Sequence, residues 1–142
     1  MLSKSAEYAI RAMIYLEVKS DGKSNLGIKA RADEIGSPVH FTAKILQVLA
    51  KQGLISSIKG PNGGFCINKD APPVKLIQVI EAIDGKRIFT GCIIGLKNCS
   101  DSNPCPIHNE YKVARNKLLI MFNERSIRDI AFNNNKLILK RK

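Results

Sequence analysis

The sequence predicts a mainly α-helical fold that carries one small two-stranded β element. Apolar residues recur every three or four positions along most of the 142 residues, which is the period of helices that bury one face. Near the middle, two short apolar runs flank a Gly-rich turn, the pattern of a β-hairpin. Towards the C-terminus, an irregular segment holds three of the four cysteines, and a long run with the apolar spacing of a helix follows it.

The first predicted helix covers residues 5–19, with Ser3 or Ser5 as its N-cap. Residues 21–25, Asp-Gly-Lys-Ser-Asn, predict the loop that ends this helix. Its apolar positions follow the spacing of one buried face, at Ala6, Ala9, Ile10, Met13 and Ile14.

Two closely spaced helices are predicted after this loop. A short one places Ala32 and Ile35 ahead of Gly36, which breaks the pattern. A longer one covers residues 38–52 and ends at Gly53. Its buried stripe is predicted to be Phe41, Ile45, Val48 and Leu49. A short helix, a tight turn with Gly and a second helix form the helix-turn-helix pattern.

A β-hairpin is predicted directly after these helices. Residues 54–59 and 65–67 have the composition of strands, and Gly-Pro-Asn-Gly-Gly at 60–64 forms the turn between them. A hairpin in this place is a wing, whose Gly-rich tip lets the backbone approach a phosphate closely. Residues 1–70 therefore predict a winged helix-turn-helix DNA-binding domain.

The run Ala71-Pro72-Pro73 marks the end of this predicted domain. Residues 71–91 are expected to form a connecting helix, and residues 92–106 an irregular, cysteine-rich sensor loop. Residues 107–142 are expected to form a long helix and a C-terminal tail, with a short further helix that begins at Ser126.

Positive charge is concentrated where the helix-turn-helix and the wing are predicted. The chain has 23 Lys+Arg and 12 Asp+Glu, a formal net charge of +11. Between Glu34 and Asp70 there are four lysines and no acid, which predicts a surface that faces phosphate. Double-stranded DNA is therefore the expected partner. The alternative is that the basicity only aids solubility.

Other classes of function lack their signatures. No run approaches 18 apolar residues, and the N-terminus carries an early acid where a signal peptide would be apolar. We therefore expect a cytoplasmic protein with no membrane partner. The sequence also shows no paired carboxylates, no Gly-rich phosphate loop and no Ser-His-Asp arrangement. We expect no enzyme and no small-molecule substrate.

The long C-terminal helix carries one apolar stripe that the compact winged helix does not need for its core. We expect this helix to form a homodimer, because DNA readers commonly pair a two-fold dimer with a palindromic site. The alternative is that the stripe packs back on its own subunit. The expected interface residues are Tyr111, Ala114, Leu118, Met121 and Phe122.

Three cysteines and a histidine lie in one irregular segment, as C-x6-C-x5-C-P-x-H from Cys92 through Cys99 and Cys105 to His108. Three thiolates on one loop can converge on a soft metal centre. The wide gaps favour an iron–sulfur cluster over zinc, whose cysteine ligands usually form closely spaced pairs. Redox thiols without metal are a third interpretation. Cys66, in the wing strand, is interpreted as structural.

These segments together resemble the Rrf-two family of winged helix-turn-helix transcription regulators, which has IscR-like and NsrR-like members. The likeness is carried by Glu7-Tyr8-Ala9-Ile10-Arg11, by Ile45-Leu46-Gln47-Val48-Leu49 and by the wing from Gly53 to Phe65. The three-cysteine loop followed by a long helix completes it, over residues 1–130.

The resemblance implies a homodimeric repressor that binds a palindromic operator and is controlled by an iron–sulfur cluster, or by the redox or nitric-oxide state of the loop. Cys92, Cys99 and Cys105 are the implied ligands. The fourth is His108 in the IscR-like case, with [2Fe-2S], which we favour. In the NsrR-like case it is an acid that corresponds to Glu7 of the partner subunit, with [4Fe-4S].

This chain departs from the family pattern in the first cysteine gap, which has six residues where relatives usually have five. Cluster-free members of the family respond to thiol oxidation or to a protein partner, and this is the main alternative. A zinc-binding regulator and a metal-transfer protein are the remaining ones.

The recognition helix is expected to enter the major groove with the face that is not buried. IscR-like readers have a glutamate where this chain has Ala43, so its operator specificity is expected to differ. The expected DNA contacts are His40, Thr42, Ala43, Lys44, Gln47 and Lys51 on the helix, and Lys59, Asn62 and Gly63 on the wing.

Overall fold

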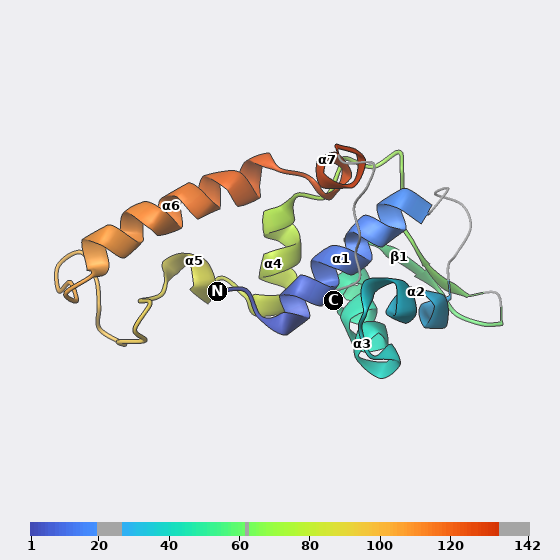
Figure 1. Ribbon diagram of the computed structural model, residues 1–142, viewed down its shortest axis with the longest axis horizontal. Coiled ribbons are helices and arrows are strands. Elements are labelled where there is room, and N and C mark those ends of the chain that lie inside the picture. The colour runs from blue at the N-terminus through green and yellow to red at the C-terminus, as the bar shows by residue number, and fades with distance from the viewer. Residues whose placement is uncertain (20–26, 62, 134–142) are drawn as a thin grey trace.

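The computed structural model describes residues 1–19, 27–61 and 63–133 (Figure 1). This part of the chain is mainly helical with one two-stranded antiparallel sheet, which confirms the predicted fold class. The predicted loop at 21–25, Asn62 and the tail after residue 133 lie outside the described residues. The elements are α1 (Lys4–Lys19), α2 (Ile28–Ile35), α3 (Val39–Lys51), β1 (Ser56–Ile58), β2 (Gly64–Cys66), α4 (Leu76–Asp84), α5 (Arg87–Thr90), α6 (His108–Glu124) and α7 (Ile127–Phe132).

Helix α1 lies at the centre and contacts α2, α3, α4 and α7. Ser3 caps it, because its Oγ accepts the backbone N–H of Ala6 at 3.0 Å. The N–H of Ser3 also donates to the carboxylate of Asp84 at 3.1 Å, and its hydroxyl donates to the same group. The start of α1 is therefore tied to the end of α4. Fully buried side chains of α1 include Met13 and Leu16.

The buried face of α3 differs from the predicted one. The structure buries Thr42, Ile45, Leu46 and Leu49, whereas Val48 is 38% exposed and Phe41 is half-buried. The predicted stripe and the observed stripe both have helical spacing. They differ because α3 is rotated about its axis, so that another face of the helix packs toward α1. Phe41 packs edge-on against Tyr8 of α1, with ring centroids 5.5 Å apart.

The wing is shorter than predicted. Its two strands pair antiparallel, with Ser57 opposite Phe65. All of β1 is exposed, whereas Phe65 and the adjacent Ile67 are buried on the helical core. The turn between the strands requires glycine: Gly60 has a φ of 111°, and a Cβ on Gly63 would overlap the carbonyl oxygen of Ile58.

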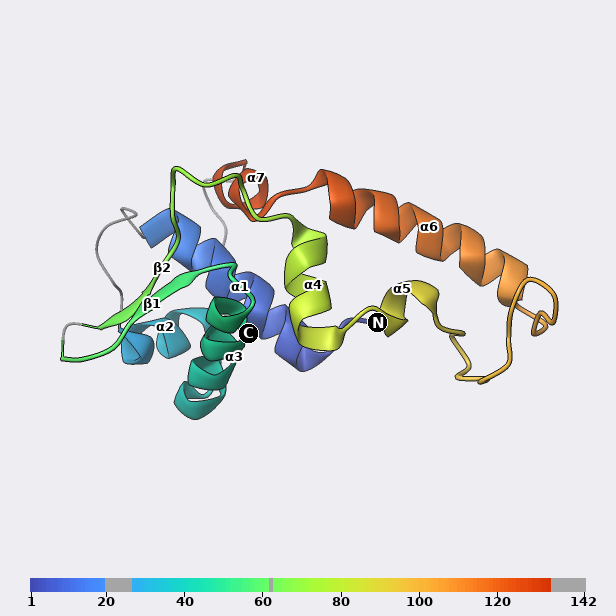
Figure 2. The same cartoon turned by 180° about the vertical axis from the view of Figure 1, so that it is seen from behind.

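Helix α6 extends away from the winged helix as a long arm (Figures 1 and 2). Its first residues follow the cysteine-rich segment at the far end of the arm, and its last residues lead into α7, which packs on α1. The junction is fixed by two backbone bonds, from the N–H of Leu76 to the oxygen of Arg125 (2.9 Å) and from the N–H of Ile127 to the oxygen of Val74 (2.8 Å). None of the described helices is long and apolar enough to cross a membrane.

One carboxylate is buried inside this architecture. Glu17 of α1 is 1% exposed, and its Oε2 lies 2.7 Å from Nζ of Lys69 and 3.5 Å from Nε of Arg128. Nζ of Lys69 also donates to the backbone oxygen of Glu17 at 2.6 Å. Lys69 follows the wing and Arg128 belongs to α7, so the carboxylate joins three separate parts of the chain. Such a buried charge is tolerated only because its partners remain in place.

Replacing Lys69 by methionine keeps most of the side-chain volume and leaves Glu17 buried with only the longer Arg128 contact. We expect Lys69→Met to lower the free energy of unfolding by about 3 kcal/mol, the cost of removing one partner of a buried ion pair. Urea denaturation at a fixed protein concentration measures this change. Lys51→Met, which removes an exposed lysine at the end of α3, should cost well under 1 kcal/mol. Equal losses in the two variants would contradict the structural role of the pair.

Candidate metal centre and nucleic-acid interface

The segment between α5 and α6 folds into successive turns that bring the three cysteines of the predicted site together. The N–H of Gly95, at a φ of 78°, bonds to the oxygen of Cys92 at 3.0 Å. The N–H of His108 bonds to the oxygen of Cys105 at 3.0 Å, at the start of α6. The glycine turn lies within the six-residue gap and takes up its length, so the extra residue does not keep the cysteines apart.

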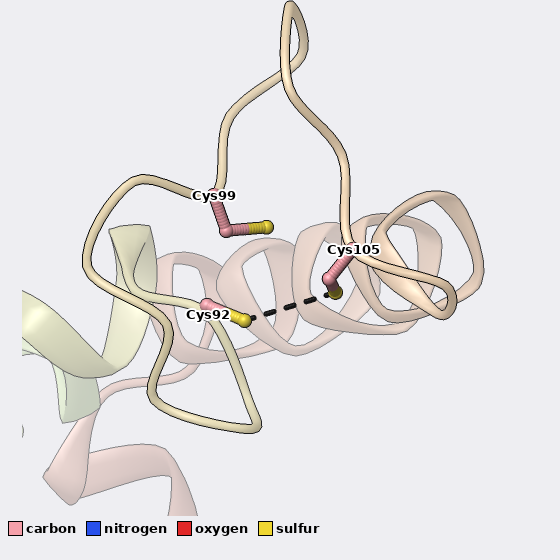
Figure 3. Close-up of side chains that lie close together, drawn as sticks. All are labelled: Cys92, Cys99 and Cys105. Carbon is pink, nitrogen blue, oxygen red and sulfur yellow. Dashed lines mark hydrogen bonds between the residues drawn. The ribbon is translucent and has the colours of Figure 1, made fainter.

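The three thiols point toward one another (Figure 3). Their sulfur atoms all lie within 4.8 Å of one another, and Sγ of Cys92 lies 3.8 Å from Sγ of Cys105. A tetrahedral ion with metal–sulfur bonds of about 2.3 Å holds its sulfur ligands about 3.8 Å apart. Cys105 is buried, and Cys92 and Cys99 are half-buried. The sulfurs are therefore close enough to share one soft metal centre.

His108 reaches one member of this group. Its Nδ1 lies 3.1 Å from Sγ of Cys99, and its Nε2 lies 2.8 Å from Oδ1 of Asp101. Nζ of Lys112 donates to both carboxylate oxygens of Asp101, at 2.8 Å each. The bond from Lys112, followed by that from His108, lowers the pKa of Asp101 to about 2. Neither His108 nor Glu7 is among the residues grouped with the three sulfurs, and the alternative ligand Glu7 would come from the partner subunit.

The thiols differ in acidity. Burial raises the pKa of Cys92, but hydrogen bonds from the backbone of Leu96 and Ile94 and from the two other thiols outweigh it, and the pKa falls to about 7. For Cys99, the backbone bond to Cys105 lowers the pKa, whereas burial and the two neighbouring thiols raise it more, so its pKa lies above the ordinary value. Cys92 therefore ionises before Cys99.

The partly buried guanidinium of Arg115 faces the same site. A cavity of about 10 Å³ is lined by the three cysteines, His108 and Arg115. Nη1 of Arg115 donates to the oxygen of Gly91 at 3.0 Å, while its Nε is buried and has no hydrogen-bond partner in the described structure. A positive group with a spare donor suits anionic thiolates or an anionic cluster. The donor set thus fits a soft metal centre, although this cavity holds only one atom and a larger group needs the loop to open.

Most of the residues predicted to contact DNA are accessible. Lys44, Gln47 and Lys51 are exposed along α3, as are His40 near its start and Lys59 directly after β1. Ala43 and Gly63 are half-buried. A groove of about 370 Å³ lies between α3 and the wing, lined among others by Gln47, Lys59 and Gly63.

The structure corrects the prediction for Thr42. This residue is 1% exposed, and its Oγ1 lies 2.7 Å from Oγ of Ser37 and 2.9 Å from the backbone oxygen of Pro38. The hydroxyl therefore stabilises the turn between α2 and α3 and does not face the groove. The residue was misplaced because the true buried stripe of α3 is rotated relative to the predicted one.

The structure also corrects one predicted dimer residue. Phe122 is 6% exposed and packs against Phe89 of the same chain, with ring centroids 6.2 Å apart. Tyr111 and Leu118 are half-buried within the subunit, whereas Ala114 is exposed and Met121 is 43% exposed. The apolar stripe of α6 is thus divided. One edge packs on α5 of the same chain, and the other edge, with Ala114 and Met121, is exposed.

Three further residues of the site, Asp101, Lys112 and Arg115, were not predicted from the sequence. The helical spacing between His108 and Lys112, four residues apart, could have indicated that they share a face. The turn composition around Asp101, Ser-Asp-Ser-Asn-Pro, could have indicated a tight turn there. For Arg115, about two turns into α6, no local signal was present.

The sequence is similar to known transcription regulators along nearly its whole length. The profile of the Rrf2 (Rrf-two) family, described as iron-dependent transcriptional regulators, matches residues 2–133. An HTH-type transcriptional regulator of Aquifex aeolicus is 27% identical over 132 residues, 92% of this chain and 90% of that protein. The HTH-type transcriptional regulator IscR of Escherichia coli is 25% identical over 132 residues, 93% of this chain and 80% of IscR.

Solved structures share the fold. CymR, the global cysteine regulator of B. subtilis, superposes with a TM-score of 0.76 at 19% identity, over 95% of this chain and 98% of CymR. IscR of T. potens superposes with a TM-score of 0.71 at 18% identity, over 94% of this chain and 87% of that protein. These relatives are regulators and not enzymes. The chain therefore belongs to the Rrf2 family of winged helix-turn-helix transcription regulators.

Proposed function

We propose that this protein is a homodimeric repressor whose affinity for operator DNA is controlled by an iron–sulfur cluster at Cys92, Cys99 and Cys105, or by the redox or nitric-oxide state of this site. The observation that carries the proposal is the convergence of the three sulfurs within 4.8 Å at the start of α6. The IscR relatives and the buried Nε–H of Arg115 beside the sulfurs support it.

His108 is the proposed fourth ligand and [2Fe-2S] the proposed cluster, in preference to [4Fe-4S] with Glu7 of the partner subunit. The support is local, since Nδ1 of His108 lies 3.1 Å from Sγ of Cys99 within the same chain. When bound, the cluster supplies a centre that reacts with oxidants and nitric oxide. The protein contributes the three thiolates, the imidazole of His108 and the positive charge of Arg115 beside them.

The proposed DNA contacts are the accessible ones of α3 and the wing. Gln47 and Lys44 are placed to reach base edges in the major groove. His40, Ala43 and Lys51 lie along the same helix. Lys59 and Gly63 of the wing are proposed to contact the phosphate backbone, as is Asn62, which lies outside the described residues. Lys and Gln side chains on one helix and a basic wing satisfy the charge pattern of a DNA reader.

The homodimer is proposed to form through the open edge of α6. Ala114 and Met121 are exposed there, together with Val113 and Ile120, which are 59% and 56% exposed. An apolar pocket of about 480 Å³ lies beside α6, between the N-terminal residues and α5, and it includes Tyr111, Leu118 and Cys92. A second copy would cover these surfaces and set the separation of two recognition helices on a palindrome. A change at Cys92 would then alter the dimer and the spacing of its DNA-binding domains.

The cluster is tested by anaerobic purification followed by iron, sulfide and absorption measurements. We expect about two iron and two acid-labile sulfide per chain, with visible absorption that bleaches in air. Cys99→Ser should lose most of the iron, whereas Cys66→Ala, in the wing, should keep it. A colourless wild-type protein that holds stoichiometric zinc, or no metal, would rule out the cluster.

Phosphate contact by the wing is tested with Lys59→Met. We expect weaker binding to double-stranded DNA from its own promoter region. The slope of log affinity against log salt concentration should become less steep by about 2, because each of the two wings of the proposed homodimer loses one phosphate contact. Fluorescence anisotropy at several potassium chloride concentrations measures both. Lys86→Met, which removes an exposed lysine between α4 and α5, should leave the slope unchanged. An unchanged slope in Lys59→Met would remove the wing from the proposed interface.

Direct thiol sensing is the second candidate function, favoured by the 3.8 Å between the sulfurs of Cys92 and Cys105 and by the low pKa of Cys92. The thiolate is the nucleophile, so reactivity rises as the pH rises through the pKa. In metal-free protein, we expect alkylation of Cys92 by iodoacetamide to reach half its maximal rate near pH 7, the pH given by the lowered pKa, and Cys99 to react only at higher pH.

The same protein should form a Cys92–Cys105 disulfide with diamide, as the two thiols lose two protons and two electrons to the reagent. Peptide mass spectrometry identifies both the alkylated residue and the disulfide. If Cys92 and Cys99 titrate alike and no intramolecular disulfide forms, direct thiol sensing at this site is excluded.

A further inference from the structure

The ring of His108 is held from the side opposite the cysteines. Its Nε2 lies 2.8 Å from Oδ1 of Asp101, and its Nδ1 lies 3.1 Å from Sγ of Cys99. The side chain of His108 is only 11% exposed, so it has little water to replace either partner. A carboxylate only accepts hydrogen bonds, and a neutral imidazole carries one N–H. The contacts of the ring therefore decide which nitrogen keeps the proton.

We infer that Asp101, clamped by Lys112, is a positioning residue that holds His108 as its Nε2–H tautomer, with the Nδ1 lone pair directed at the cysteine site. The proton stays on Nε2 because the carboxylate of Asp101 accepts the hydrogen bond that Nε2–H donates. Nδ1 is then a bare lone pair, which is the form in which a histidine binds a metal. The tautomer is a property of the metal-free chain, whereas its use in ligation rests on the proposed metal centre.

Two features keep Asp101 in place although its side chain is 70% exposed. The first is the turn that carries it: Ser100 and Asn103 exchange backbone N–H···O bonds of 3.1 Å, and the side-chain amide of Asn103 donates to the oxygen of Asn98 at 3.1 Å. Asp101 and Ser102 are the two residues at the tip of this closed turn. The carboxylate is thereby directed back toward α6.

The second feature is Lys112, whose Nζ lies 2.8 Å from each carboxylate oxygen. An exposed hydrogen bond to a single partner competes with water and contributes little. Here one carboxylate is shared between an imidazole and an ammonium group from the same helix, four residues apart. The three side chains form a small network, which orients the ring better than one pair can.

This arrangement has a direct consequence for the loop. Asp101 lies between Cys99 and Cys105, and Lys112 lies on α6, so the network joins the sensing loop to the long helix beside the sulfurs. The histidine is therefore oriented before any metal arrives. Orienting partners of this kind change metal affinity by 10- to 100-fold in other sites.

The tautomer is tested first in the metal-free, ¹⁵N-labelled full-length chain by NMR, at about pH 8.5, roughly two units above the ordinary imidazole pKa. The chain has only two histidines, so His40→Gln assigns the signals. We expect a slowly exchanging proton on Nε2 of His108 in the wild type. Asp101→Ala should lose this signal to exchange with water, and Lys112→Met should weaken it. Glu110→Gln, which removes an exposed carboxylate from the same helical turn, should leave it unchanged.

The effect on ligation is tested with Co²⁺ alone as the probe, from its thiolate charge-transfer absorption. Asp101→Ala should raise the Kd for Co²⁺ by 10- to 100-fold. His108→Ala should also raise it, and the double variant should match His108→Ala, because Asp101 acts only through the ring. A residue that merely stabilised the loop would weaken binding equally in both backgrounds.

The outcomes separate the two proposals. An Nε2 proton that is absent from the wild type or insensitive to Asp101→Ala overturns the inference, as does an undiminished effect of Asp101→Ala in the His108→Ala background. If the wild type binds no Co²⁺ while its Nε2 proton depends on Asp101, the positioning role stands and the metal centre falls.

Discussion

The buried carboxylate of Glu17 determines how the C-terminal arm is attached to the winged helix. It meets Lys69 just after the wing and Arg128 in α7, so three segments far apart in the sequence share one charge. The backbone bonds between Val74–Leu76 and Arg125–Ile127 fix the register of the same junction. Because a buried carboxylate cannot lose its partners cheaply, these segments are held as one body. Any change in the direction of α6 must therefore act on the winged helix as a whole.

Helix periodicity and turn chemistry predicted most of the architecture. The Gly36 turn, the hairpin at 60–64 and the helices on either side of the cysteines all depend on local signals, and the structure contains them. The exact buried face was less predictable, because Phe41 and Val48 are as apolar as the residues that α3 does bury. Which face is buried depends on where α1 lies, and this is a tertiary property. The four-residue helix α5 was missed for a related reason, since it is too short to have a period.

The site shows the same division between local and distant information. The three cysteines were identified by their spacing, and the turns do bring their sulfurs together. Asp101 and Arg115 were not identified, because what matters is their distance from His108 and from the sulfurs after folding. Phe122 has the spacing of the dimer stripe, but Phe89 of the same chain covers it. An apolar stripe on one helix indicates that this face will be buried, but it does not indicate whether the same chain or a partner buries it.

Metal binding and thiol oxidation compete for the same atoms. A bond between Cys92 and Cys105 would use two of the three sulfurs and leave Cys99 and His108 alone, which is too few ligands for a stable centre. The two proposed sensing chemistries are thus mutually exclusive states of one loop.

The cysteine-rich loop lies at the end of α6 that is remote from the winged helix, so the whole length of α6 separates the sulfurs from the DNA-binding domain (Figure 1). A helix of 17 residues is about 25 Å long, and helices bend little over that length. A tilt of about four degrees imposed at one end displaces the other by nearly 2 Å, by the geometry of a rigid rod of that length. Because the helix is a rigid rod, a small rearrangement at its sulfur-bearing end would be transmitted along its whole length to the end that joins the DNA-binding domain.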